Sequence, residues 1–210
     1  MKVTLLKLLM ASSLMLVSVP ALYAKTLIEE AKSAGLAPLP KNQKEIDKFL
    51  KENNVKSSAF SEAKAELGKK LYFDPRLSKS GLISCNTCHN LGLGGADGIA
   101  AAVGHKWSPN HQHLNSPTVY NSVFNTIQFW DGRAGNLIEQ AKGPIENEVE
   151  MATPANLAVK KIASLPEYVN AFKKTYGKVS FENIADAIAN FERTLITPSP
   201  FDKFLEGDEK

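Results

Sequence analysis

Apolar residues recur at helical spacing in several segments of the chain, and each such segment predicts an amphipathic helix. Between residues 44 and 53, Ile46, Phe49 and Leu50 lie at helical spacing among lysine and acidic residues. Helices are expected over 27–34, 44–53, 61–72, 136–142, 166–176 and 181–195, with one more after Thr153. The fold is therefore expected to be mostly α.

Turn-forming residues mark several of the expected helix ends. Asp74-Pro75 should stop the helix over 61–72, because proline disfavours helical backbone in the residue before it. Thr153-Pro154 resembles an N-cap followed by a proline in the first turn. Gly177 should end the helix over 166–176.

The segment 81–130 lacks this periodicity. It is rich in glycine and contains all four histidines and both tryptophans. An irregular stretch of this length is usually either functional or disordered. A bound prosthetic group would give such a loop something to wrap around.

The only two cysteines stand in the run Cys85-Asn86-Thr87-Cys88-His89, which is the attachment signature of a c-type haem. Each thiol can form a thioether bond to a haem vinyl group, and His89 can bind the iron as proximal ligand. A thioredoxin-like redox pair would lie near a βαβ pattern, and none is visible. A zinc site would need His111 and His113, whose spacing is too short, and a disulfide would leave His89 unexplained. One haem c per chain is expected.

The first 24 residues resemble a secretory signal peptide. Lys2 and Lys7 precede an apolar run over 8–19, and residues 21–24 offer small side chains for cleavage after Ala24. The apolar run is short for a membrane span, and an uncleaved N-terminal anchor is the alternative. Because covalent haem attachment takes place outside the inner membrane, both features favour the periplasm.

Charge excludes some classes of partner. Removal of the signal peptide takes away two of the 25 basic residues and none of the 22 acidic ones, so the mature chain is close to neutral. No strong field for nucleic acid or for a membrane surface follows. The remaining length suits one domain with its own core.

A haem bound through His89 has a sixth coordination position, for which four residues are generic candidates. Gly104 beside His105 suits a close approach to a ring. His111 and His113 are more typical of an exposed loop, and Met151 of a hydrophobic core.

Three further residues could take part in redox chemistry. Trp130, in the aromatic turn 129–134, could stack near a haem and carry electrons, or it could simply pack. Glu150 could move a proton between the two oxygens of a peroxide molecule, which is general acid–base work, and the amide of Gln140 could hold the departing oxygen. By spacing alone, Glu150 is one of 22 acidic residues, and such a residue is usually a surface charge.

Taken together, these motifs resemble the bacterial di-haem cytochrome c peroxidases. One similar segment, 67–78, precedes the haem motif. The others follow it, in the same order as in the family: 92–95, 104–107, 115–119, 128–134, 140–144, 149–151 and 195–198. A related group of di-haem enzymes, which finish a tryptophan-derived quinone in methylamine dehydrogenase, shares the fold and matches less well.

The resemblance implies a cytochrome c-like haem domain with long irregular loops around the haem. Cys85 and Cys88 would hold the peroxidatic, low-potential haem, with His89 as its proximal ligand. His105 would be the distal ligand that leaves when the enzyme is activated.

It also implies roles for the polar residues. Glu150 would be the acid–base catalyst and Gln140 would line the peroxide pocket beside it. Trp130 would lie between two haems on the electron path. Asn115 would donate to a calcium ion at a domain interface, since a hard cation prefers oxygen ligands.

The chain departs from the family in one respect, because no second cysteine pair is present. The family has a second domain with its own haem motif, which would begin where this chain ends. The expected organisation is a signal peptide over 1–24, an N-terminal helical extension over 25–66, the peroxidatic haem domain over 67–200 and the start of a second haem domain over 201–210. A fragment, a truncated gene or a true one-haem protein would each account for this.

The resemblance implies reduction of hydrogen peroxide to water with electrons from a small periplasmic cytochrome c or cupredoxin, with this chain supplying the peroxidatic half. The alternative is a monohaem electron-transfer cytochrome in which His89 and His105 stay bound to the iron. A homodimer is one of the oligomeric forms left open.

Overall fold

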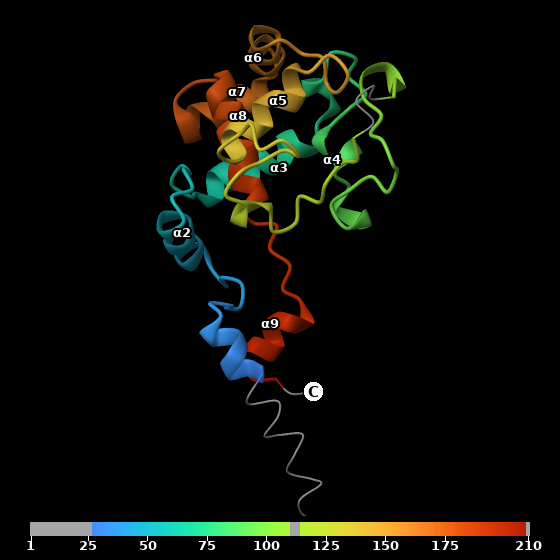
Figure 1. Ribbon diagram of the computed structural model, residues 1–210. Coiled ribbons are helices and arrows are strands. Elements are labelled where there is room, and N and C mark those ends of the chain that lie inside the picture. The colour runs from blue at the N-terminus through green and yellow to red at the C-terminus, as the bar shows by residue number, and fades with distance from the viewer. Residues whose placement is uncertain (1–26, 110–113, 209–210) are drawn as a thin grey trace, which may run out of the picture. The chain divides into compact units, whose positions relative to one another are not determined.

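The computed structural model describes residues 27–109 and 114–208 (Figure 1). The expected signal peptide and two of the candidate ligands, His111 and His113, lie outside the described residues. The described chain is helical and has no β-strand, only the isolated bridges Val103–Pro109 and Gln128–Ala134. The mostly α prediction is confirmed.

The chain divides into two compact units, one over Asn42–Thr197 and the other formed by its two ends. The larger unit contains α2 (Gln43–Glu52), α3 (Glu62–Phe73), α4 (Cys85–Cys88), α5 (Leu137–Glu146), α6 (Ala155–Ala163), α7 (Pro166–Tyr176) and α8 (Phe181–Glu192). Its short 3₁₀ helices are η1 (Pro75–Leu77), η2 (Leu91–Leu93), η3 (His105–Trp107) and η4 (Ser122–Phe124).

The core of this unit is built on the crossing of α3 and α8. A Cβ added to Gly68 of α3 would lie 1.8 Å from the carbonyl oxygen of Ala187 in α8, so only glycine allows this contact between the two backbones. Leu71 and Tyr72 of α3 are fully buried there, as is Ile184 of α8. The crossing places α4 beside α3 and so positions the haem motif.

Most expected helices are confirmed, and α7 has the predicted bounds. The prediction that α5 ends at Lys142 was wrong, because the helix continues through Pro144 to Glu146. The N-cap prediction at Thr153 was also wrong: Pro154 occupies the cap position of α6, and the Thr153 hydroxyl donates to the carbonyl of Met151 (3.2 Å). Thr153 is fully buried, and this bond to a carbonyl two residues away gives its hydroxyl a hydrogen-bond partner.

The smaller unit, over its described residues, contains a helix at 27–33 and α9 (Pro200–Leu205). Ser199 and Asp202 form a capping box at the start of α9. Asp202 also accepts a hydrogen bond from the backbone N–H of Leu39 (2.8 Å), and Lys41 pairs with Glu206 (2.6 Å). These bonds tie the two ends of the chain together, while the domain boundaries expected from the sequence stay a prediction.

Across the described residues, the helices are all too short or too polar to cross a membrane.

A candidate haem-binding site

The haem motif forms the short helix α4. The backbone N–H of Ser84 donates to the Thr87 hydroxyl (2.9 Å), and that of Thr87 donates to the Ser84 carbonyl (3.0 Å), which fixes the start of the helix. Cys85 and Cys88 are three residues apart and therefore lie on one helix face. Both thiols are free, and burial raises the pKa of the Cys88 thiol to about 11. No disulfide competes with thioether formation.

His89 follows directly and is held by two contacts. Its Nδ1 lies 2.9 Å from the carbonyl oxygen of Pro117. A carbonyl can only accept, so Nδ1 carries the proton and Nε2 is left with its lone pair. Tyr72 donates its hydroxyl to the His89 carbonyl (2.6 Å), which anchors the backbone of the motif to α3. Burial lowers the pKa of His89 and so favours the neutral, metal-binding imidazole.

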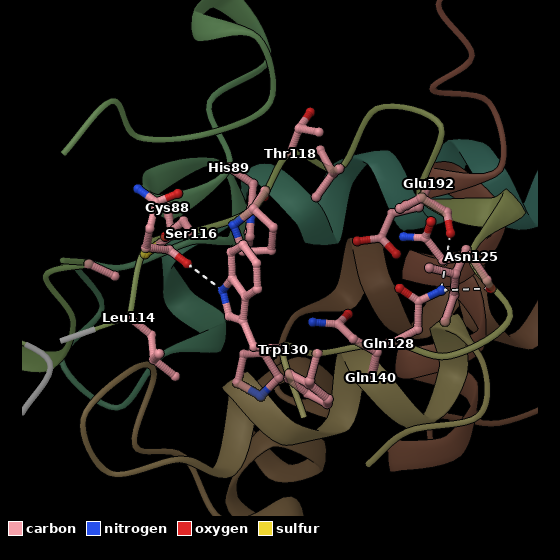
Figure 2. Close-up of a pocket in the computed structure, with 18 of the residues that line it drawn as sticks. Cys88, His89, Leu114, Ser116, Thr118, Asn125, Gln128, Trp130, Gln140 and Glu192 are labelled. Atoms are coloured by element: carbon pink, nitrogen blue, oxygen red, sulfur yellow. Dashed lines mark hydrogen bonds between the residues drawn. The ribbon is translucent and has the colours of Figure 1, made fainter. Parts of the chain in front are cut away.

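A cavity of about 290 Å³ opens beside these residues (Figure 2). It is lined by six of the residues expected at the site: Cys88, His89, Asn115, Trp130, Gln140 and Glu150. A smaller cavity of about 50 Å³ adds Cys85 and Met151. Cys88 and His89 line both, so the two spaces adjoin along the haem motif. The structure thus gathers residues from 85 to 150 around one cleft.

Gln140 and Glu150 reach this cleft from α5 and from the turn after it. Asn147 donates its side-chain amide to Glu150 Oε1 (2.9 Å). Burial raises the pKa of Glu150 above its ordinary value, and the hydrogen bond from Asn147 and the charge of Arg133 offset this only in part. A raised pKa makes a carboxyl group a better base, as a residue that accepts and returns a proton needs to be. Pro144 lacks an N–H, so the backbone carbonyl of Gln140 has no helical partner there.

Trp130 and Asn115 meet at the mouth of the cleft. The Trp130 indole N–H donates to the backbone carbonyl of Asn115 (3.0 Å), while the indole is 66% exposed. The Asn115 side-chain amide donates to the Ile99 carbonyl (2.6 Å). No group of three or more acidic, histidine or cysteine side chains in the described chain could hold a metal ion. The calcium role of Asn115 stays a prediction.

His105 does not line either cavity. Its Nδ1 is buried without a hydrogen-bond partner among the residues that the structure describes. The loop at this point is pressed against the turn that carries Glu150, because a Cβ added to Gly104 would lie 1.9 Å from the Val149 carbonyl oxygen. Lys106 and Trp107 have φ angles of 57° and 60°, a region that costs energy for residues other than glycine. Met151 is buried in the hydrophobic core.

One residue of the cleft was missed by sequence reasoning. Glu192 at the end of α8 lines both cavities and is 5% exposed. The signal was present, because Glu192 falls four and eight residues after Ile188 and Ile184, on the buried face of the helix. An acidic residue in register with core positions is a candidate for a site, and helical spacing could have found it.

The residues present fit a covalently attached haem. Two free thiols share a helix face, the adjacent imidazole has an unprotonated Nε2, and a cavity lies beside all three. Other polar residues of the cleft, such as Gln140 and Glu150, would then face the bound group. Two thiols that can attach the vinyl groups and one imidazole that can bind the iron are the combination that haem c requires.

Comparison with known proteins agrees with this geometry. The sequence profile described as "Di-haem cytochrome c peroxidase" matches residues 62–210. The cytochrome c551 peroxidase of Pseudomonas aeruginosa is 48% identical over 206 residues, which is 96% of this chain and 56% of that protein. The cytochrome c551 peroxidase of Nitrosomonas europaea is 57% identical over 148 residues, or 69% of this chain and 44% of that protein.

A solved structure shows the same fold. The crystal structure of a MauG-like protein associated with microbial copper homeostasis superposes with a TM-score of 0.66 at 25% identity, over 72% of this chain and 46% of that one. The chain spans about half the length of the curated relatives it matches. On these matches, the chain belongs to the di-haem cytochrome c peroxidase family.

Proposed function

We propose that this chain provides the haem site at which hydrogen peroxide is reduced to water. The observation that carries the proposal is the single cleft shared by the haem motif, the amide of Gln140 and the partly buried carboxyl group of Glu150. An electron carrier needs only ligands and an exposed haem edge. A partly buried acid and an amide facing the same space suit a reaction in which protons move.

Each residue has a distinct role in this proposal. Cys85 and Cys88 hold the haem by thioether bonds, and His89 holds the iron through Nε2. When bound, the haem supplies the iron that exchanges electrons with peroxide. Glu150 transfers a proton between the two peroxide oxygens, and Gln140 donates a hydrogen bond to the oxygen that departs.

Three further roles rest on resemblance to the family. His105 is the distal ligand of the resting state and leaves on activation. Trp130, exposed at the cleft mouth, lies on the electron path, and the oxygen of Asn115 contributes to a calcium site. The full reaction takes electrons from a small cytochrome c or cupredoxin in the periplasm, after removal of the signal peptide over 1–24. A second haem domain of the family would receive those electrons, and the protein would work as a monomer or homodimer.

Removal of the His105 side chain tests this proposal, because His105 is the residue proposed to occupy the distal position. In the His105→Gly variant the distal position is open, so the haem-loaded chain should bind cyanide and react with peroxide without prior reduction. Absorbance after rapid mixing measures both. The matched control is Lys106→Gly in the same loop, which keeps the histidine and should behave as the parent.

A His105→Gly variant that binds cyanide but does not react with peroxide would contradict the proposal and favour the alternative, a monohaem electron carrier. A variant that binds neither would show that another residue, such as Met151, is the distal ligand. Haem content measured by mass spectrometry on the same samples separates that outcome from a failure to load the haem.

A further inference from the structure

Glu192 is an acidic residue at a position suited to an apolar side chain. It ends α8, on the same face as Ile184 and Ile188, which are 0% and 1% exposed. Its own exposure is only 5%, and its carboxyl group lies at the wall shared by the two cavities. Burying an ionised carboxylate without a partner is costly, so this carboxyl group needs an explanation.

The surroundings of Glu192 do not satisfy it. Its Oε2 is fully buried and has no hydrogen-bond partner within the described part of the chain. Asp186, six residues earlier on the same helix, differs in its second oxygen. Its Oδ1 also lacks a partner, but its Oδ2 accepts a hydrogen bond from the Tyr176 hydroxyl (2.6 Å) and pairs with Lys64 (3.0 Å). The carboxyl group of Glu192 is left for whatever occupies the cleft (Figure 2).

The charged and titratable groups around Glu192 do not stabilise its ionised form. Tyr72 on α3 and Cys85 on α4 interact with it electrostatically, and each disfavours a negative charge on the other. From α5 the facing side chain is the neutral amide of Gln140. Burial alone raises the pKa of Glu192 to about 8, and no charged group of α5 or α6 opposes it.

The adjacent cation is engaged elsewhere. Arg193 donates through Nη1 to the Ser58 carbonyl (2.9 Å) and pairs through Nη2 with Asp47 (2.6 Å), so these two nitrogens bind α2 and the segment after it. Its Nε has no hydrogen-bond partner among the described residues. In Figure 2, Cys88, His89 and Trp130 lie on one side of the pocket, and Glu192 lies on the other with Asn125 and Gln128. A haem held by Cys88 and His89 would extend across this space toward Glu192.

We propose that Glu192 is a proton site coupled to the electron on the haem. When one electron from the reductant enters the haem, one proton from water binds the Glu192 carboxylate, and reoxidation releases both. The physical cause is Coulombic. In a low-dielectric cleft, a negative carboxylate repels an incoming electron, whereas the neutral acid does not. The inference rests on the proposed haem site and adds a proton site distinct from Glu150.

Linkage makes the coupling reciprocal: reduction raises the proton affinity of Glu192, and protonation raises the midpoint potential of the haem. The potential should therefore fall as pH rises through the range in which Glu192 ionises. Glu192 would then release this proton at the step at which the haem gives up its electron. Peroxide reduction consumes both.

Potentiometric titration of the haem-loaded chain from about pH 6 to about pH 10 tests this. We expect the midpoint potential of the parent to fall with rising pH around pH 8. In Glu192→Gln this fall should be lost, because an amide does not ionise. The matched control, Asp186→Asn, changes a buried acid of the same helix that faces away from the cleft, and it should keep the fall of the parent. A Glu192→Gln variant that keeps the parent's pH dependence would overturn the proposal.

A second measurement needs no variant. The infrared spectrum of the reduced parent minus that of the oxidised parent, recorded at about pH 8 with ¹³C-labelled glutamate, should show a protonated carboxylic acid gained on reduction. Absence of that band would also overturn the proposal. A chain that shows the band but does not react with peroxide would contradict only the peroxidase function, and absence of covalent haem on the parent would contradict both.

Discussion

Asp74 and Glu192 are both buried acids of the same helical unit, yet their surroundings are opposite. Asp74, 8% exposed, accepts hydrogen bonds from the backbone and side chain of Arg76 (2.9 Å each to Oδ1) and from the Tyr168 hydroxyl (2.8 Å). Burial alone would raise the pKa of Asp74, but the hydrogen bonds from Arg76 and Tyr168 bring it below its ordinary value. Glu192 has no such partners, and its pKa rises to about 8.

The difference separates carboxyl groups that hold the fold from those that face the cleft. Asp74 caps η1 and links it to α7 through Tyr168, so its charge is used within the protein. Glu192 and Glu150 leave polar atoms turned toward a cavity, with their pKa values raised by burial. An unsatisfied buried acid is costly in a structural role. An acid that also faces a cavity, as Glu192 does, is therefore a candidate for the site.

The largest effect, on haem content, should follow from removing one of the two thiols that attach the haem in the cleft. Cys85→Ala and Cys88→Ala each remove one thioether bond, and the chain should lose most of its haem. Denaturing mass spectrometry of periplasmic protein measures the covalent load. The control is Met151→Leu, which keeps the volume of a buried side chain beside the same cleft. Covalent haem at the parent level in both cysteine variants would show that the motif does not attach it.

Substitution of Glu150, the second acid of the cleft, should slow the reaction with peroxide without changing the haem content. Glu150→Gln keeps the shape but cannot accept a proton, and a positioned acid–base group typically contributes about 10²–10⁴-fold. Single-turnover mixing of the haem-loaded chain with peroxide should show slowing in that range with unchanged haem content. Glu148→Gln, an exposed acid two residues away, is the matched control. If Glu150→Gln reacts as fast as the parent, Glu150 does not transfer a proton in the reaction and belongs with the acids that hold the fold.

The sequence predicted the cleft better than it predicted the acids that distinguish it. Cys85, Cys88 and His89 are contiguous and carry their chemistry in their spacing, and the helices could be placed from their periodicity, α7 to the residue. Spacing alone could not separate Glu150 from the other acidic residues, because its place in the cleft depends on a loop that packs Gly104 against its backbone. Glu192 was missed because a carboxyl group on a helix gives no sign of its burial unless its register with Ile184 and Ile188 is examined.

Local hydrogen bonds limited the prediction of helix ends in the same way. The start of α6 looked like a threonine cap, but Thr153 is fully buried and bonds to the Met151 carbonyl. Residue propensity does not show whether a threonine hydroxyl caps a helix or bonds to a nearby backbone carbonyl, because the same side chain can do either. The helix predicted over 181–195 ends at Glu192, three residues earlier than expected. The carboxyl group of this last helical residue lies at the cleft.

The pH dependence of stability should have opposite signs for the two kinds of acid. The folded state holds the Glu192 proton up to about pH 8, whereas the unfolded chain loses it near 4.5. Between these values the unfolded state binds fewer protons, so the free energy of unfolding should fall as pH rises, by up to about 1.4 kcal/mol per pH unit. Urea denaturation of the haem-loaded chain at several pH values measures the slope. Glu192→Gln should flatten it, and an equal slope in that variant would contradict the raised pKa.

Asp74 should show the smaller effect and the reverse sign. Asp74→Asn keeps the shape and one acceptor oxygen but weakens the bonds from Arg76 and Tyr168, so the free energy of unfolding at pH 7 should drop by about 1–3 kcal/mol. The folded-state pKa of Asp74 lies below its ordinary value of 3.8. Its contribution is therefore fully present above about pH 4 and is lost as pH falls through the folded-state pKa.

Urea denaturation of parent and variant at pH 7 and at about pH 3 measures the difference, which should shrink at the lower pH as the parent carboxylate takes up its proton. Asp131→Asn is the matched control, because Asp131 also pairs with an arginine two residues later, Arg133, but is exposed, and an exposed pair adds little to stability. Equal stability of Asp74→Asn and the parent at pH 7 would mean that the bonds from Arg76 and Tyr168 do not stabilise the fold. Pairing would then no longer distinguish the acids that hold the fold from those that face the cleft.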